Sequence, residues 1–298
     1  MSISPYIREI GRGKDGARSL TREQAADLFG QVLDGAVTDL EIGAFCIAMR
    51  VKGETPQEMA GFLDATAARM HRVPASRQPL VVLPSYNGAR KLPLLTPLLA
   101  LLVAREGLPV LIHGTQTEPS RVFVTDVLDA LDRPREIPFL ATEALCPGLK
   151  RLLDVRRTIG LRNSSHSLVK LMNPCAGEAV VVGSYTHPEY AVSMAAVCEL
   201  MGTTAMLLRG TEGEPVADPR RMRRMDGFVR GERLDLEAEQ QGTVTELPDL
   251  PADIAPHATA AYIRDVLSGK RPVPAPIGRQ VEHILRLAAM AARQEASQ

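Results

Sequence analysis

The side chains best suited to chemistry in this chain are basic, and they gather in two regions. Arg90 and Lys91 follow a short apolar run at residues 80–83, and residues 146–172 carry six basic side chains against one acid, Asp154. Arginine and lysine bind phosphate oxygens by charge-assisted hydrogen bonds without reading a base sequence. The alternative is that they are solvated charges on surface helices. The residues predicted to contact phosphates are Arg90, Lys91, Lys150, Arg151, Arg156, Arg157, Arg162 and Lys170.

Two polar segments follow predicted strands, at residues 84–91 and 113–121. Ligands of a parallel sheet bind beyond the carboxyl ends of its strands, so these segments predict a cleft. His113 has the chemistry of a general base, but no serine or cysteine nucleophile with partners accompanies it, and a structural role is the alternative. We therefore predict no catalytic residue. The predicted cleft residues are Ser85, Tyr86, Asn87, Gly88, His113, Gly114 and Arg121.

Composition excludes several classes of protein. The 298 residues are 45% hydrophobic and 23% charged, as in ordinary globular proteins. The 35 basic and 35 acidic residues cancel, although residues 231–255 hold seven acids against one arginine. Four widely spaced cysteines predict neither a zinc site nor a disulfide framework, and favour reduced thiols in the cytoplasm. We expect no metal site, and no membrane partner because no apolar run is long enough to cross a bilayer.

The secondary structure predicted to position these residues changes along the chain, from helices alone to alternating strands and helices. Thr21 with Gln24, and Thr38 with Glu41, have the spacing of capping boxes that open helices. Thr55 begins another helix, with Pro56 at its first position. From residue 79 onwards, short β-rich runs alternate with helical stretches, which predicts βαβ units in a parallel sheet.

We therefore predict an α/β protein with a small N-terminal helical domain and a large, mainly parallel α/β domain. The helical domain is expected over residues 1–74, joined by a helix near 163–174, and the α/β domain over 75–298. The acid-rich segment 231–255 is expected to be an excursion or an edge hairpin, and two further helices are expected near the C-terminus.

Several motifs resemble the anthranilate phosphoribosyltransferase family. The resemblance runs over about residues 7–214 and rests on motifs that keep the family's order and spacing. These are residues 42–56, His113-Gly114, Asn173-Pro174 and His187-Pro-Glu189. The resemblance implies a nucleoside phosphorylase/phosphoribosyltransferase-like fold, usually dimeric through the helical domain. We therefore expect a homodimer formed in that way.

The functional motifs of that family are altered here. The resemblance places its glycine-rich phosphate turn at Pro84–Gly88, where proline has no amide to donate and tyrosine fills space. Its metal-binding Asp-Glu pair, in a Gly-Leu-Asp-Glu context, matches Gly213-Glu-Pro-Val216, so both metal carboxylates are missing. Glu212 and Glu214 are close in sequence but out of register. We therefore expect phosphoribosyl pyrophosphate with magnesium to bind poorly, and anthranilate not to be consumed.

The sequence also resembles the YbiB-type branch of this family, through residues 84–91, Arg162–His166 and residues 210–214. That branch is regarded as binding nucleic acid and lacking the biosynthetic activity. The resemblance, together with the basic residues, predicts sequence-independent binding of DNA or RNA through the phosphate backbone, with no cofactor. The alternative is an anthranilate phosphoribosyltransferase-like glycosyltransferase, a pentosyltransferase with an altered phosphate cradle, which would use Mg²⁺.

Overall fold

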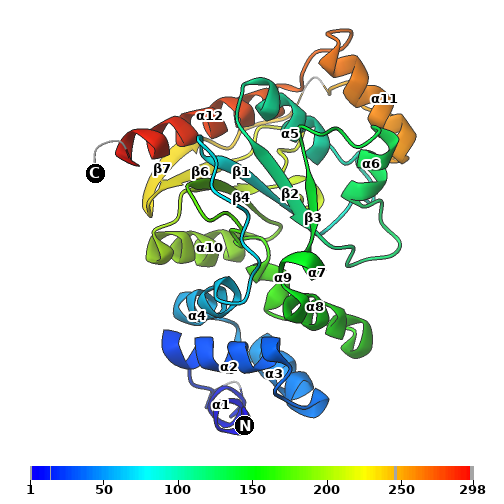
Figure 1. The fold of residues 1–298 in the computed structure, drawn as a ribbon. Helices are drawn as coiled ribbons and strands as arrows, with labels where there is room; N and C mark the ends of the chain where they lie inside the picture. Colours follow the sequence, from blue (N-terminus) through cyan, green and yellow to red (C-terminus); the bar gives the residue numbers. More distant parts are fainter. Residues whose placement is uncertain (1, 14, 245–246, 296–298) are drawn as a thin grey trace. The chain divides into compact units, whose positions relative to one another are not determined.

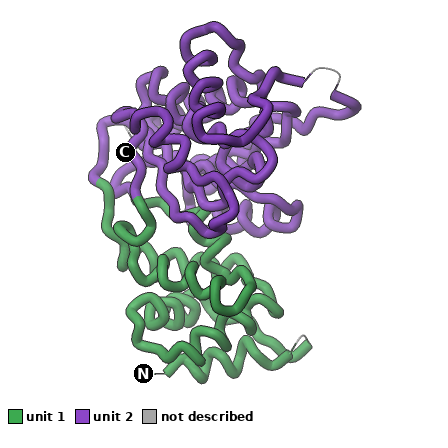
Figure 2. Tube along the Cα trace, turned by 90° about the vertical axis from the view of Figure 1, so that its right-hand side faces the viewer, with its two compact units in different colours: residues 1–73, 141–174 green, residues 74–140, 175–298 purple. Residues whose placement is uncertain are grey.

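The computed structural model describes residues 2–13, 15–244 and 247–295, and the chain divides into two compact units. Unit 1 comprises residues 1–73 and 141–174, and unit 2 comprises residues 74–140 and 175–298 (Figure 2). The helical domain expected from the sequence was residues 1–74 with a helix near 163–174. Unit 1 differs by including residues 141–162 as well.

Unit 1 is helical. Its elements are α1 (Ser4–Ile10), α2 (Arg22–Asp34), α3 (Asp39–Lys52), α4 (Pro56–Ala67), α7 (Thr142–Leu145), α8 (Pro147–Ile159) and α9 (Ser165–Leu168). The capping boxes predicted for α2 and α3 are confirmed, with Thr21 and Thr38 as N-caps. The predicted helix start at Thr55 is also confirmed, and Thr55 with Glu58 forms a third capping box there. Each threonine accepts a hydrogen bond from a backbone amide that the helix leaves unpaired.

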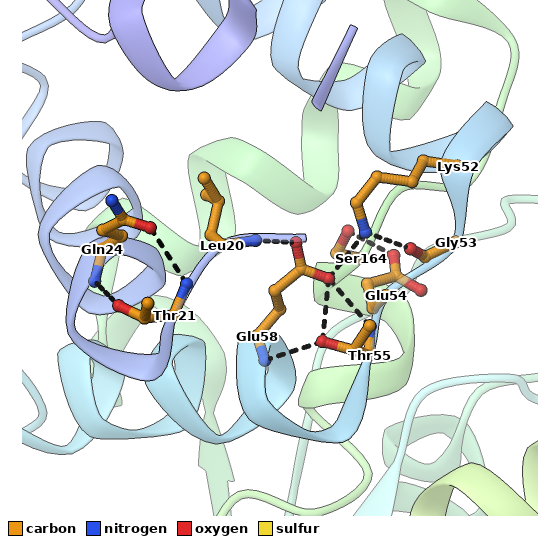
Figure 3. A network of polar contacts seen from close by, with 9 residues as sticks. All are labelled: Leu20, Thr21, Gln24, Lys52, Gly53, Glu54, Thr55, Glu58 and Ser164. Atoms are coloured by element: carbon orange, nitrogen blue, oxygen red, sulfur yellow. Dashed lines mark hydrogen bonds and ion pairs between the residues drawn. The ribbon is translucent and has the colours of Figure 1, made fainter. Parts of the chain in front are cut away.

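The third capping box of unit 1 is part of a buried polar network (Figure 3). Glu58 is fully buried and accepts hydrogen bonds from the amides of Leu20 and Thr55, each at 2.9 Å. Lys52 lies 2.7 Å from the same carboxylate and neutralises it. Ser164, beside α9, donates to the neighbouring Glu54. The network thereby links the start of α4 to the 163–168 segment within unit 1.

Close packing explains why α8 belongs to unit 1. The rings of Phe29 and Phe62 stack with centroids 4.6 Å apart, and Phe45 packs edge-on against both. At the end of α2, a Cβ added to Gly148 would lie 2.1 Å from the Leu33 carbonyl oxygen. Glycine therefore lets α8 approach the backbone of α2 directly.

Unit 2 is built on a seven-stranded sheet with the order β3-β2-β1-β4-β5-β6-β7. The strands are β1 (Leu80–Ser85), β2 (Val110–Gly114), β3 (Phe139–Ala141), β4 (Ala179–Tyr185), β5 (Ala205–Arg209), β6 (Met225–Val229) and β7 (Glu232–Glu237). The pairs β1–β2, β1–β4 and β4–β5 are parallel, while β6 and β7 are antiparallel. The predicted large, mainly parallel α/β domain is confirmed.

Helices cover both faces of this sheet (Figure 1). They are α5 (Thr96–Arg105), α6 (Val124–Ala130), α10 (Pro188–Met201), α11 (Pro256–Leu267) and α12 (Ala275–Glu295). Helices α5 and α12 pack on one face and α10 packs on the other, with α6 and α11 beside α5. Buried strand residues such as Val81 and Ile112 join one continuous core with these helices. Within the described ranges, no helix is both long and apolar enough to span a bilayer.

Candidate anion-binding site

The candidate site of unit 2 lies beyond the carboxyl ends of β1, β4 and β5. Strand β1 stands between β2 and β4 in the sheet, so the chain runs outward in opposite directions from the β1–β4 pair. Such a switch point leaves a crevice between the loops that follow the two strands. The loops after β1 and β5 supply most of the polar groups there.

The turn at residues 85–88 encloses a carboxylate from the chain itself. Glu214, which is fully buried, accepts hydrogen bonds from the amides of Asn87 (2.7 Å) and Gly88 (2.8 Å). Its other oxygen accepts from the hydroxyls of Ser85 and Thr96. Successive amides pointing into one concavity form an anion-binding nest, and here the anion is Glu214.

A second carboxylate binds the next turn in the same way. Glu212 accepts from the amides of Arg90 (2.7 Å) and Lys91 (3.1 Å), with a longer contact of 3.5 Å to the amide of Leu92. Its own backbone is left-handed, with φ +52°, a conformation that costs free energy in residues other than glycine. The carboxylates of Glu212 and Glu214 both reach the loop after β1, because the loop after β5 folds back over it.

The structure brings the seven predicted cleft residues together. Ser85 and Gly114 are register partners in β1 and β2, and a Cβ on Gly114 would lie 1.8 Å from the Ser85 carbonyl oxygen. The Tyr86 hydroxyl lies 2.9 Å from His113 Nδ1, with both residues buried. Arg121 donates to the Asn87 carbonyl at 3.1 Å. Tyr86, His113 and Arg121 therefore brace the turn.

A cavity of about 420 Å³ lies beside the turn. Lys91 and Leu92 line it from the loop after β1, Thr186 from the loop after β4, and Arg209 from the end of β5. The other lining residues follow β5 along the chain: Gly210, Thr211, Glu212, Asp218, Arg220 and Arg223. Four basic and two acidic side chains give the lining a net charge of +2.

The pocket's charges differ in how they are paired. Arg220 forms two hydrogen bonds of 2.9 Å with Asp218, and Arg223 lies 2.6 Å from Glu239. Burial alone would raise the pKa of Asp218, but the hydrogen bonds from Arg220 outweigh it and hold that pKa below its ordinary value. Among the residues described, neither Lys91 nor Arg209 forms an ion pair.

Sequence reasoning missed most of this pocket. Arg209 ends one of the short β-rich runs, at residues 205–209, which was the available signal. Arg220 and Arg223 lie in an irregular segment without a pattern. Their approach to Lys91 depends on the strand order, with β4 next to β1 and β5 beyond it. Strand order is not readable from local patterns.

The predicted phosphate-binding cluster divides between the units. Arg90 and Lys91 belong to unit 2, and the other six residues belong to unit 1. Lys170 is buried, which contradicts a surface contact. Arg151 donates a hydrogen bond to the Leu33 carbonyl at the end of α2, so its positive charge stabilises the C-terminus of that helix.

The other predicted contacts in unit 1 are more accessible. Lys150 and Arg157 both pair with Asp154, and the Arg157 side chain remains 58% exposed. Arg156 and Arg162 are half-buried and flank His166. Burial, helped by these two positive charges, lowers the pKa of His166 to about 3. His166 is therefore neutral at pH 7 and adds no charge to the basic residues around it.

Magnesium does not fit the carboxylates of this site. Glu214 already accepts four hydrogen bonds, Glu212 is held by backbone amides, and Asp218 is paired with Arg220. Within the described ranges, no group of three or more His, Cys, Asp or Glu side chains is arranged to hold a metal ion. A magnesium site normally offers free carboxylate oxygens in an octahedral arrangement.

Comparison with known proteins shows which family the chain is similar to. Residues 4–70 match the helical bundle domain of a glycosyl transferase family. An anthranilate phosphoribosyltransferase from Sorangium cellulosum is 31% identical over 84% of this chain and 77% of its own length. This chain belongs to the anthranilate phosphoribosyltransferase family.

One further relative and one solved structure match most of this chain's length. YbiB, an uncharacterised protein of Escherichia coli, is 38% identical over 92% of this chain and 90% of its own. The anthranilate phosphoribosyltransferase of Saccharomyces cerevisiae, solved with phosphoribosyl pyrophosphate and Mg, matches with a TM-score of 0.71 at 15% identity. That match covers 98% of this chain and 90% of the yeast chain, and shows a shared fold.

Proposed function

We propose that this chain is a phosphoribosyltransferase-like glycosyltransferase with an altered phosphate cradle, which binds the phosphates of a pentosyl donor in the basic pocket beside that cradle. The observation that carries the proposal is the pairing pattern of the pocket. Lys91 and Arg209, from the loop after β1 and the end of β5, face it without a carboxylate partner among the described residues. Unpaired cations in a concave site bind phosphate oxygens strongly.

The chemistry of pentosyl transfer suits such a pocket. The bond between the sugar C1 and a pyrophosphate oxygen breaks, the electron pair leaves with pyrophosphate, and the acceptor bonds to C1 and loses a proton. Negative charge grows on the leaving group, so cations placed there stabilise the transition state. Lys91 and Arg209 are the residues that fit this role. The family name indicates an acceptor of the anthranilate type.

Calorimetry with phosphoribosyl pyrophosphate tests donor binding. The wild-type chain is expected to bind, and Arg209→Ala to weaken binding about tenfold or more, because a charge-assisted hydrogen bond is lost. Arg90→Ala is the matched control, because Arg90 is exposed, adjacent to Lys91 and outside the pocket lining. Equal affinity in Arg209→Ala and wild type, or no binding by wild type, contradicts the proposal.

Anthranilate fluorescence tests transfer separately. Loss of fluorescence with phosphoribosyl pyrophosphate present, slowed in Arg209→Ala and unaffected in Arg90→Ala, supports an enzyme acting on this acceptor. Donor binding without fluorescence loss contradicts transfer to anthranilate and leaves a donor-binding protein.

A second candidate function is sequence-independent binding of nucleic acid by unit 1. The observation that favours it is the net charge of +5 over residues 146–172, with Arg157 well exposed on α8. Phosphate contacts of this kind release counterions, so binding weakens steeply with salt. Less positive charge is available to phosphates than this count suggests. Lys150 and Arg157 pair with Asp154, Arg151 contacts a helix end, and Lys170 is buried.

Anisotropy titrations of labelled duplexes test this candidate. If Arg157 contacts a phosphate, Arg157→Glu weakens binding to all sequences alike and makes the log–log salt slope shallower by about 0.9. Arg135→Glu, an equal charge change at an exposed position of unit 2, is the control. Identical salt slopes in the two variants contradict the candidate.

A further inference from the structure

The turn at residues 85–88 and the first residue of α5 together present four hydrogen-bond donors to one point inside unit 2. Two are the backbone amides of Asn87 and Gly88, and two are the hydroxyls of Ser85 and Thr96. Backbone amides at the carboxyl end of a parallel strand are a common setting for a bound phosphate. All four donors point to the carboxylate of Glu214.

The Glu214 carboxylate is held by neutral donors in the described part of the chain. Among the described residues, no Lys, Arg or His side chain forms an ion pair with it, and its hydrogen-bond partners are the four neutral donors. Ionised carboxylates that are fully buried are normally paired with a cation. Glu214 therefore relies on the same neutral amide and hydroxyl donors that an enclosed phosphate oxygen would use.

The loop that carries Glu214 is fitted closely to the turn. A Cβ on Gly213 would lie 2.0 Å from Asn87 Nδ2, and a Cβ on Gly210 would lie 1.7 Å from the Glu214 carbonyl oxygen. Asn87 Nδ2 also donates to the Glu212 carbonyl at 2.8 Å, and Ser184 donates to the Gly213 carbonyl at 2.7 Å. Because Gly210 and Gly213 have no side chain, the loop can approach the turn closely enough to place the Glu214 carboxylate in it.

We infer that Glu214 is a built-in anion, which takes the place of a phosphate group in the 85–88 turn and keeps phosphate ligands out of it. The turn keeps an anion-bound shape with no ligand, because the chain supplies the negative charge. The inference rests on the turn alone and holds whether or not the neighbouring pocket binds a pentosyl donor.

Rescue by small anions tests this role. Glu214→Ala leaves the four donors without an acceptor, so the full-length variant is expected to melt at a lower temperature than wild type. Formate or inorganic phosphate, at about ten times its dissociation constant and constant ionic strength, then raises the melting temperature of Glu214→Ala by about 3 °C more than that of wild type. Phosphate bound in the pocket would raise all melting temperatures alike, so the difference reports on the turn.

Two variants serve as controls. Leu83→Ala leaves a cavity on buried β1 without exposing donors, and is expected to melt lower than wild type with no extra response to anions. Glu214→Gln keeps the bulk and an acceptor, and is also expected to show no extra response. If Glu214→Ala does not fold, Glu214→Ser frees the same amides. The inference is overturned if anions raise the melting temperature of Glu214→Ala (or Glu214→Ser) no more than that of Leu83→Ala. It is also overturned if they raise that of Glu214→Gln more than that of wild type.

Discussion

At the residue scale, Glu58 shows what a buried carboxylate contributes when it has a cation. It closes the capping box of α4 and pairs with Lys52, whose side chain is 8% exposed (Figure 3). Glu58→Ala leaves the ammonium buried without its partner, so we expect a loss of about 3 kcal/mol in the free energy of unfolding. Gln24→Ala, which removes the equivalent but exposed residue of the α2 capping box, is expected to cost about 1 kcal/mol or less. Urea unfolding followed by circular dichroism measures both, and equal losses contradict the account.

His166 gives unit 1 a defined sensitivity to acid. Its pKa is about 3 in the folded chain and about 6.5 when unfolded, so below pH 6.5 the unfolded state binds a proton that the folded state excludes. Stability should therefore fall as the pH drops from 6.5 towards 3, by about 2 kcal/mol at pH 5 from this group. His166→Gln is expected to remove that part of the pH dependence. The exposed His257→Gln is the control, and the same pH slope in both variants contradicts the assignment.

The sequence identified some of these residues and not others. The Thr38–Glu41 spacing was sufficient to predict a capping box, because a cap depends only on residues three positions apart. The roles of Glu212 and Glu214 depend on a contact across more than 120 positions, made by a loop with a left-handed residue. No local pattern carries that information.

At the element scale, α3 presents an exposed apolar face. Leu40, Ile47 and Val51 are 83%, 41% and 63% exposed and recur at helical spacing along that face. Exposed apolar surfaces of this kind usually mark an interface. We propose that a second copy of the chain covers it, in agreement with the homodimer expected through the helical domain.

Light scattering coupled to gel filtration tests this dimer. Wild type at micromolar concentration is expected to show the mass of two chains, and Leu40→Glu with Ile47→Glu the mass of one, because burying two carboxylates is costly. Val192→Glu, at an exposed apolar position on α10 of unit 2, should leave the mass unchanged. A double variant that keeps the wild-type mass contradicts the assignment of α3.

At the scale of the whole molecule, the fold was more predictable than the site. Alternating strands and helices after residue 79 were enough to predict the parallel strands, because buried strands differ in composition from the helices between them. The antiparallel β6 was missed, since Met225–Val229 contains an aspartate and a glycine that weaken the strand pattern. Residues 141–162 join unit 1 through the contact between Gly148 and Leu33, which only the folded chain reveals.

The central claim is that the donor's phosphates bind in the pocket while the Glu214 carboxylate stays bound in the 85–88 turn. A crystal structure grown with phosphoribosyl pyrophosphate and Mg²⁺ tests it most directly. We predict electron density for the pyrophosphate against Lys91 and Arg209, with Glu214 still accepting hydrogen bonds from the amides of Asn87 and Gly88. Pyrophosphate bound to those two amides with Glu214 displaced, or no ligand in the pocket at a saturating concentration, would contradict it.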